Sequence, residues 1–145
     1  MNVYLACTVR GDRGALAAAR VIALAIGDAG HRVLTSHLLE DDADGAEARL
    51  TEREVFERDM AWLAEADMLI AEASGSSFGV GFELGYFLAH ASGNRRALLL
   101  YDVARREKVS RLALGNSHPN CMTYGYDGAV ALRRFLADFL ARSPN

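Results

Sequence analysis

A glutamate set among three glycines is the strongest chemical signal in the sequence. Glu83 follows Gly79 and Gly81 and precedes Gly85, in the run Gly-Val-Gly-Phe-Glu-Leu-Gly. An apolar, strand-like segment ends a few residues upstream, at Ala73. A strand that leads through small residues into a helix brings side chains and backbone N–H groups to the carboxyl edge of a parallel sheet, where open α/β folds bind ligands. We therefore expect Glu83 to be a catalytic carboxylate. Alternatively, Glu83 has no catalytic role and only interacts favourably with the helix dipole.

A second carboxylate, Asp59, lies on the helix expected before the third strand. Two carboxyl groups at the anomeric carbon of a sugar can divide the roles of nucleophile and proton donor. Asp59 and Glu83 form such a pair if both face one cleft. Otherwise Asp59 is a solvated helix charge. Tyr4 belongs to the first strand, where its position alone predicts core packing.

Groups suited to a phosphate follow the first strand. Thr8, Arg10 and Gly11 offer a hydroxyl, a guanidinium and free backbone N–H groups at its carboxyl end. Arg10 is equally well explained as a surface loop charge. Ser77 precedes the helix of Glu83, where a serine either binds an anion or simply caps the helix. A lone histidine at the end of the second strand, His37, is more often structural than catalytic.

Strand-like and helix-like segments alternate along the whole chain. Strands are predicted over 3–8, 32–37, 68–73, 97–101 and 122–126, and helices over 15–29, 51–66, 79–91, 104–115 and 127–140. Thr51 and Glu54 form a capping box, Gly30 and Asp127 are expected caps, and residues 39–50 are expected to be a surface loop or lid. This alternation predicts one doubly wound α/β domain over 1–145, with a five-stranded parallel sheet in an order like 2-1-3-4-5 and helices on both faces.

Net charge and composition limit the classes of partner and cofactor that this chain is expected to bind. The chain has 145 residues and a net charge of −3, which gives no electrostatic case for a nucleic acid polymer or an anionic membrane. A mononucleotide needs only a local site. Cys7 and Cys121 lack metal-ligand spacing, and no secretory signal or stretch of about 20 apolar residues is visible. We expect a cytoplasmic protein with reduced thiols, no metal and no organic cofactor.

These residues, in this order, resemble the nucleoside 2-deoxyribosyltransferase superfamily, and within it most closely the 2′-deoxynucleoside 5′-monophosphate N-glycosidases. The similarity covers nearly the whole chain. It is carried by Tyr-Leu-Ala-Cys-Thr-Val-Arg-Gly at 4–11, by His37, by Asp-Met-Ala-Trp-Leu-x-x-Ala-Asp at 59–67, and by Ser-Phe-Gly-Val-Gly-Phe-Glu-Leu-Gly at 77–85.

The resemblance implies roles for the three candidate catalytic residues. Glu83 would be the nucleophile at C1′ of the deoxyribose, Asp59 would orient it and help with proton transfer, and Tyr4 would hold the glutamate. Hydrolysis would then release free base and 2-deoxyribose 5-phosphate through a covalent glutamyl-sugar intermediate, with retention. Such a mechanism needs carboxyl groups roughly 5–5.5 Å apart.

The resemblance also implies a 5′-phosphate and sugar site. It would be formed by Thr8, Val9, Arg10 and Gly11, with His37, Ser77 and Gly79. The transferases carry an aspartate in the segment of Ser77, where it binds a free 5′-hydroxyl. A carboxylate would repel a phosphate and a serine can donate to it, so this substitution favours a nucleotide substrate.

A neighbouring subunit completes the phosphate site in the hydrolase branch. The counterpart of its serine-containing segment is Ser110-Arg111-Leu112, and the apolar helix over 79–91 also predicts a homodimer or higher homo-oligomer. The residues Cys7, Thr8 and Asp12 depart from the family pattern in positions that shape the pockets, which leaves the preferred base open. The alternatives are a nucleoside 2-deoxyribosyltransferase, a CMP-type ribonucleotide N-glycosidase and a non-catalytic nucleotide-binding module.

Overall fold

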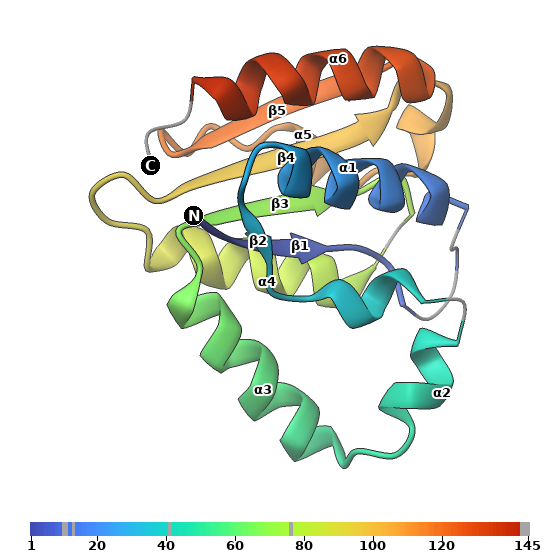
Figure 1. Ribbon diagram of the computed structural model, residues 1–145, viewed down its shortest axis with the longest axis vertical. Coiled ribbons are helices and arrows are strands. Elements are labelled where there is room, and N and C mark those ends of the chain that lie inside the picture. Colours follow the sequence, from blue (N-terminus) through green and yellow to red (C-terminus); the bar gives the residue numbers. More distant parts are fainter. Residues whose placement is uncertain (10–11, 13, 41, 76, 143–145) are drawn as a thin grey trace.

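The computed structural model describes residues 1–9, 12, 14–40, 42–75 and 77–142. Within them, five parallel strands form one sheet in the order β2-β1-β3-β4-β5 (Figure 1), which confirms the predicted doubly wound topology. The strands are β1 (Asn2–Ala6), β2 (Arg32–Val33), β3 (Met68–Glu72), β4 (Arg96–Asp102) and β5 (Cys121–Tyr126). The helices are α1 (Leu16–Asp28), η1 (Ser36–Leu39), α2 (Ala43–Glu47), α3 (Glu52–Glu65), α4 (Phe78–Ala89), η2 (Val103–Lys108), α5 (Arg111–Leu114) and α6 (Gly128–Ala141).

Each face of the sheet has its own hydrophobic core. In β1, Val3 and Leu5 pack with α1 and α6, whereas Tyr4 and Ala6 pack with α3 and α4. This alternation is the period of two that a strand imposes, and it was expected from the sequence. Figure 1 shows α1 and α6 on one side of the sheet and α4 on the other. The face of Tyr4 is therefore the one that α3 and α4 share.

Helix α3 is held at both ends. Its capping box is confirmed, because Thr51 Oγ1 accepts from Glu54 N at 3.2 Å and Thr51 N donates to Glu54 Oε2 at 2.8 Å. At the other end the Arg95 guanidinium lies 4.5 Å from the Phe87 ring centroid and donates to the carbonyls of Leu63 and Ala66. The N-terminal part of α3 leans away from the sheet (Figure 1).

The predicted second strand, 32–37, is wrong beyond Val33. The buried Thr35 hydroxyl accepts from Leu5 N at 3.1 Å and donates to Leu5 O at 2.7 Å, so a side chain replaces the backbone ladder there. The strand ends, and His37 lies in η1 instead of at a strand end. The expected loop at 39–50 contains α2, which buries Ala43 completely.

Smaller differences concern helix ends. The helix expected over 104–115 is divided into η2 and α5, because Val109 between them is extended and buried in the core. Asp127 is the N-cap residue of α6, but its side chain makes no capping hydrogen bond. Helix α1 ends at Asp28 with Ala29 as its cap, and Gly30 follows with a φ of 76°.

Among the described helices none is both long and apolar enough to cross a membrane.

The role of Arg95 at the end of α3 can be tested by unfolding. Arg95→Ala should lower the free energy of unfolding by about 1–3 kcal/mol, because the last carbonyls of α3 lose their donor. The measurement is a urea titration followed by circular dichroism. The exposed neighbour gives a matched control, Arg96→Ala, which should change the value by less than about 0.5 kcal/mol. Equal losses in the two variants would contradict this role.

Candidate active site

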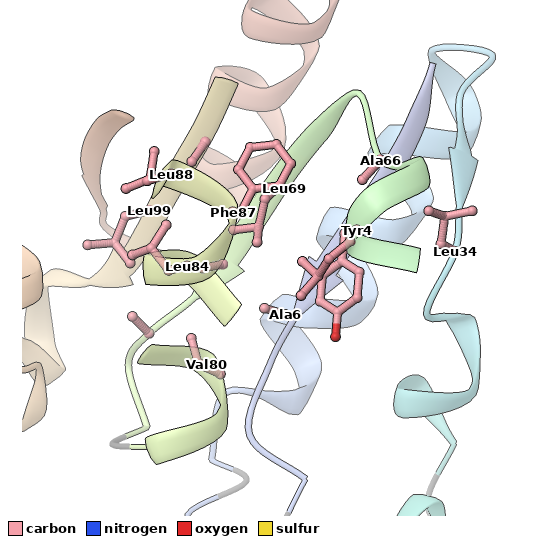
Figure 2. Packing of buried hydrophobic residues seen from close by; sticks show 14 of the residues in the cluster. Tyr4, Ala6, Leu34, Ala66, Leu69, Val80, Leu84, Phe87, Leu88 and Leu99 are labelled. Atoms are coloured by element: carbon pink, nitrogen blue, oxygen red, sulfur yellow. The ribbon is translucent and has the colours of Figure 1, made fainter. Parts of the chain in front are cut away.

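The predicted glutamate and tyrosine are in direct contact. Tyr4, on β1, donates its hydroxyl to Glu83 Oε1, on α4, at 2.8 Å. Figure 2 shows the Tyr4 ring within the apolar cluster, with its oxygen pointing away from the aliphatic side chains of Leu84 and Leu88. The expectation of core packing is thus correct for the ring, and the hydroxyl has a separate polar partner.

Burial sets the ionisation of this pair. It raises the pKa of Glu83 to about 7, and the carboxylates of Asp59 and Glu47 act in the same direction, while the Tyr4 hydrogen bond and Arg58 act against it. Burial and the neighbouring Glu83 also raise the pKa of Tyr4 far above its ordinary value. Tyr4 therefore stays a donor, and Glu83 changes charge near neutral pH, where a group that gives or accepts protons is most useful.

The two candidate carboxylates share one hollow of about 330 Å³. Glu83 and Asp59 line it together with Gly79 and with the side chains of Phe56, Met60, Phe78 and Phe82. Among the described residues, a Cβ built on Gly79 would approach only Ser77 Oγ, at 3.6 Å, and one built on Gly81 would have no neighbour within 4 Å. Gly79 lines the hollow and keeps space open beside Glu83, which is what close approach of a ligand requires, whereas Gly81 lines a different hollow.

Asp59 belongs to a charged network that sequence reasoning missed. Arg58 donates from Nε to Asp59 Oδ1 at 2.8 Å and from Nη2 to Glu47 Oε1 at 2.7 Å. The guanidinium lies 5.0 Å from the ring centroid of Trp62. His37 contacts the same ring at 5.3 Å, with its Nε2 3.5 Å from Glu47 Oε1. Burial, and then Arg58, lowers the pKa of His37, so its ring is neutral at pH 7.

The predicted phosphate segment is described in part. Thr8 is buried and donates its hydroxyl to the carbonyl of Gly75 at 3.2 Å, which joins the end of β1 to the loop after β3. A Cβ on Gly75 would lie 2.5 Å from the backbone oxygen of Asp12, so only glycine fits there. Val9 packs against the small cluster of Cys7 and Leu38. The predicted residues Arg10 and Gly11 lie outside the described residues.

The two predicted serines meet at a second, smaller hollow of about 60 Å³. Ser77 is the N-cap of α4 and accepts from Val80 N at 3.4 Å. Ser110 of the same chain, the N-cap of α5, lines this hollow with Ser77 and Gly81. Leu112 is largely exposed. Ser77 and Glu83 therefore line different hollows on either side of the first turns of α4.

A buried carboxylate, Glu72, supports the loop between β3 and α4. It accepts from Ser74 N at 3.2 Å and from the Tyr126 hydroxyl at 2.9 Å, and Ser74 Oγ accepts from Asp102 N at 2.7 Å. These bonds tie together the carboxyl ends of β3, β4 and β5.

Among the described residues, no group of three or more His, Cys, Asp or Glu side chains is arranged to hold a metal ion.

Comparisons with known proteins agree with the fold and the motifs. The family model described as nucleoside 2-deoxyribosyltransferase matches residues 3–116. A Thermofilum pendens protein, provisionally named 2′-deoxynucleoside 5′-phosphate N-hydrolase 1, is 43% identical over 126 residues, which are 87% of this chain and 85% of that protein. The 5-hydroxymethyl-dUMP N-hydrolase of Danio rerio is 31% identical over 118 residues, 81% of this chain and 80% of the relative.

A solved structure shows the same architecture. The CMP N-glycosidase of Clostridium botulinum superposes with a TM-score of 0.68 over 96% of this chain and 99% of that one, at 19% identity. At this identity the likeness concerns the fold alone. The family model spans most of the chain, including Tyr4, Asp59 and Glu83. The chain therefore belongs to the nucleoside 2-deoxyribosyltransferase family, in the branch whose named members are N-hydrolases of deoxynucleoside 5′-phosphates.

Proposed function

We propose that this protein hydrolyses the N-glycosidic bond of 2′-deoxynucleoside 5′-monophosphates to free base and 2-deoxyribose 5-phosphate. The observation that carries the proposal is a buried glutamate, held by a tyrosine at 2.8 Å and with a pKa of about 7, that shares one hollow with a second carboxylate. A module that only binds nucleotides has no need of such a pair. The relatives named as N-hydrolases of deoxynucleotides support the same substrate class.

Glu83 is the nucleophile in this proposal. Because Tyr4 occupies Oε1, we assign Oε2 to attack C1′. The new C–O bond forms as the C1′–N bond breaks, and the electron pair of that bond leaves with the base, which takes up a proton. Water then attacks C1′, loses a proton, and displaces the carboxylate. Two inversions give retention, as in glycosidases with a carboxylate nucleophile.

Because Glu83 is buried, its carboxylate can strongly stabilise the positive charge that develops on the sugar in the transition state. The transition state resembles an oxocarbenium ion, and a carboxylate in a hollow of low dielectric stabilises that cation more strongly than one in water. The carboxylate form is required, so base release should increase as the pH passes through about 7. Asp59 lines the same hollow, where it can orient Glu83 and carry a proton to or from the base and water.

Replacing the nucleophile should abolish the reaction and leave the fold intact. Glu83→Gln keeps an oxygen that can accept from Tyr4 but cannot attack C1′, so we expect a loss of roughly 10³-fold or more in turnover. Release of free base is measured by chromatography from dAMP, dCMP, dGMP, dTMP and 5-hydroxymethyl-dUMP. Acid-quenched samples, analysed by mass spectrometry, should show a sugar phosphate adduct on the unmodified protein alone.

A neutralised glutamate elsewhere is the control for this experiment. Glu57→Gln removes an exposed carboxylate from α3, and it should leave base release unchanged. If Glu83→Gln retained more than a few per cent of the turnover of the unmodified protein, the nucleophile would be another group. If the sugar were transferred to a second, added base instead of to water, the deoxyribosyltransferase alternative would replace the hydrolase.

We assign the 5′-phosphate to the region where β1 ends and α4 begins. Ser77 stands before the first N–H groups of α4, where a helix of this length favours an anion. Ser110 lines the same hollow as Ser77, and Arg10 follows β1 in the sequence. The substrate would then extend across the N-terminal turn of α4, from a phosphate near Ser77 to the sugar at Glu83.

The phosphate assignment predicts a strong preference for nucleotides over nucleosides. Charged hydrogen bonds are worth roughly 1.5–3 kcal/mol each, so two should favour the 5′-monophosphate by about two to four orders of magnitude. Ser77→Asp should remove much of this preference by repulsion. Ser77→Asn is the matched control, because it can still cap α4 without the charge. The measurement is competition between nucleotide and nucleoside at equal concentrations; equal rates in the unmodified protein would exclude phosphate recognition.

We also propose that the active form is a homodimer. Phe56, Phe78 and Phe82 are exposed around the hollow of Glu83, and exposed apolar patches of this kind commonly mark an interface. A twofold interface would cover the hollow from the open side. Light scattering should give twice the chain mass, and Phe78→Asp should give single chains. A fully active monomer at the same concentration would contradict this proposal.

A further inference from the structure

Three charged side chains meet beside the proposed site in a geometry that needs an explanation. Glu47 comes from α2, whereas Arg58 and Asp59 are neighbours on α3. Adjacent residues of a helix do not face each other, so Arg58 must fold back along the helix surface to reach Asp59. It does so with its Nε 2.8 Å from Asp59 Oδ1. This contact depends on whatever keeps Arg58 folded back.

Two contacts keep Arg58 in this conformation. Glu47 Oε1 accepts from Nη2 at 2.7 Å, and the Trp62 ring lies 5.0 Å from the guanidinium carbon. The side chains of Glu47, Arg58 and Asp59 are only 13%, 21% and 18% exposed. By comparison, the ion pair between Arg53 and Glu57 of the same helix spans 3.8 Å and is largely solvent-exposed. Water and salt screen an exposed pair much more strongly than one that is largely buried.

We propose that Arg58, held in place by Glu47, is a positioning residue that fixes Asp59 and offsets the charge that Glu83 acquires when it ionises. The proposal rests on the function proposed above, because it takes Glu83 and Asp59 as the working carboxylates. Neither Arg58 nor Glu47 lines the hollow of these two residues. Their effect therefore acts through Asp59 and through charge.

The charges that face Glu83 make the direction of this effect clear. Tyr4 faces it from β1, Asp59 and Arg58 act from α3, and Glu47 acts from α2. His37, on η1, lies against Glu47 and is neutral at pH 7. Among these groups Arg58 is the one cation, so three carboxylates share one guanidinium once Glu83 is ionised. Loss of Arg58 must make that ionisation harder, and loss of the Glu47 charge must make it easier.

The consequence for the chain is that α2 is coupled to the active site. Glu47 is the last residue of this short helix, and it is the residue that α2 places against Arg58. A change in the placement of α2 would release Arg58, which would then release Asp59. Through Glu47, α2 would therefore influence both the position of Asp59 and the pH at which Glu83 becomes a nucleophile.

The test compares two substitutions in the ion pair of Arg58 and Glu47, one that removes the positive charge and one that removes the negative charge. Arg58→Gln should move the acid limb of the pH–kcat profile upward, by roughly 0.5–1 pH unit, because a shared opposite charge shifts a pKa by less than the usual 1–3 units. Glu47→Gln should move it downward, because the amide oxygen can still accept from Arg58 Nη2 while the negative charge is lost. Arg58→Lys keeps the charge and loses the planar fork, so it should restore the position of the limb but not the full kcat. Release of Asp59 should lower kcat about 10–100-fold in Arg58→Gln, with a smaller effect on KM.

A second readout does not depend on activity. The pKa of Glu83 can be followed by carbon NMR of its carboxyl group, assigned with Glu83→Gln, and should shift in the same opposite directions. Arg53→Gln, on the exposed face of α3, is the matched control and should shift neither quantity. Circular dichroism checks folding; should Arg58→Gln fail to fold, Arg58→Lys and Glu47→Gln still decide the outcome.

The outcomes separate this inference from the proposed function. Shifts in the same direction, or no shift in either variant, would overturn the positioning role even if the unmodified protein is fully active. If the unmodified protein released no base from any nucleotide, the proposed function would fail, while the NMR titration would still show whether Arg58 and Glu47 control Glu83. Opposite shifts of the pKa would support the inference in both cases.

Discussion

The hydrogen bond from Tyr4 to Glu83 links β1 to the helix that carries the glutamate, and several other features of the structure make this contact possible. Tyr4 can reach α4 because strand alternation places it on the face that α3 and α4 cover. Its ring is fixed by the apolar cluster, so its hydroxyl has little freedom of direction. A buried carboxylate without such a donor would be costly to keep in place.

The loop between β3 and α4 sets the other side of this contact. Gly75 lets the Asp12 backbone approach to a distance that no side chain would allow, and Thr8 bonds to the Gly75 carbonyl. Behind the loop, Glu72 joins the ends of three strands through Ser74 and Tyr126. The start of α4 is thereby fixed relative to β1, which fixes Glu83 relative to Tyr4.

The sequence allowed most of the fold and the central residues of the candidate site to be predicted. The period-two pattern of β1 and the capping box of Thr51 depend on local chemistry, so they are visible without coordinates. The end of β2 could not be predicted, because it depends on the Thr35 hydroxyl, which takes the place of backbone hydrogen bonds to Leu5 in β1, a strand far away in the sequence. Glu47 and Arg58 were missed for a similar reason. Their meeting depends on where α2 lies in space, and no spacing in the sequence expresses that.

Burial of Glu83 has a cost that varies with pH. Its pKa rises from an ordinary value of 4.5 to about 7 on folding, so the folded chain holds a proton that the unfolded chain releases between these values. The contribution of Glu83 to the free energy of unfolding is therefore fully present below about pH 4.5. It declines as the pH rises through about 7, by roughly 3 kcal/mol at most. The protein is thus least stable in the ionised form that the proposed reaction needs. In the proposed glutamyl-sugar ester the carboxylate charge is gone, so forming that bond would return part of the stability that ionisation removed.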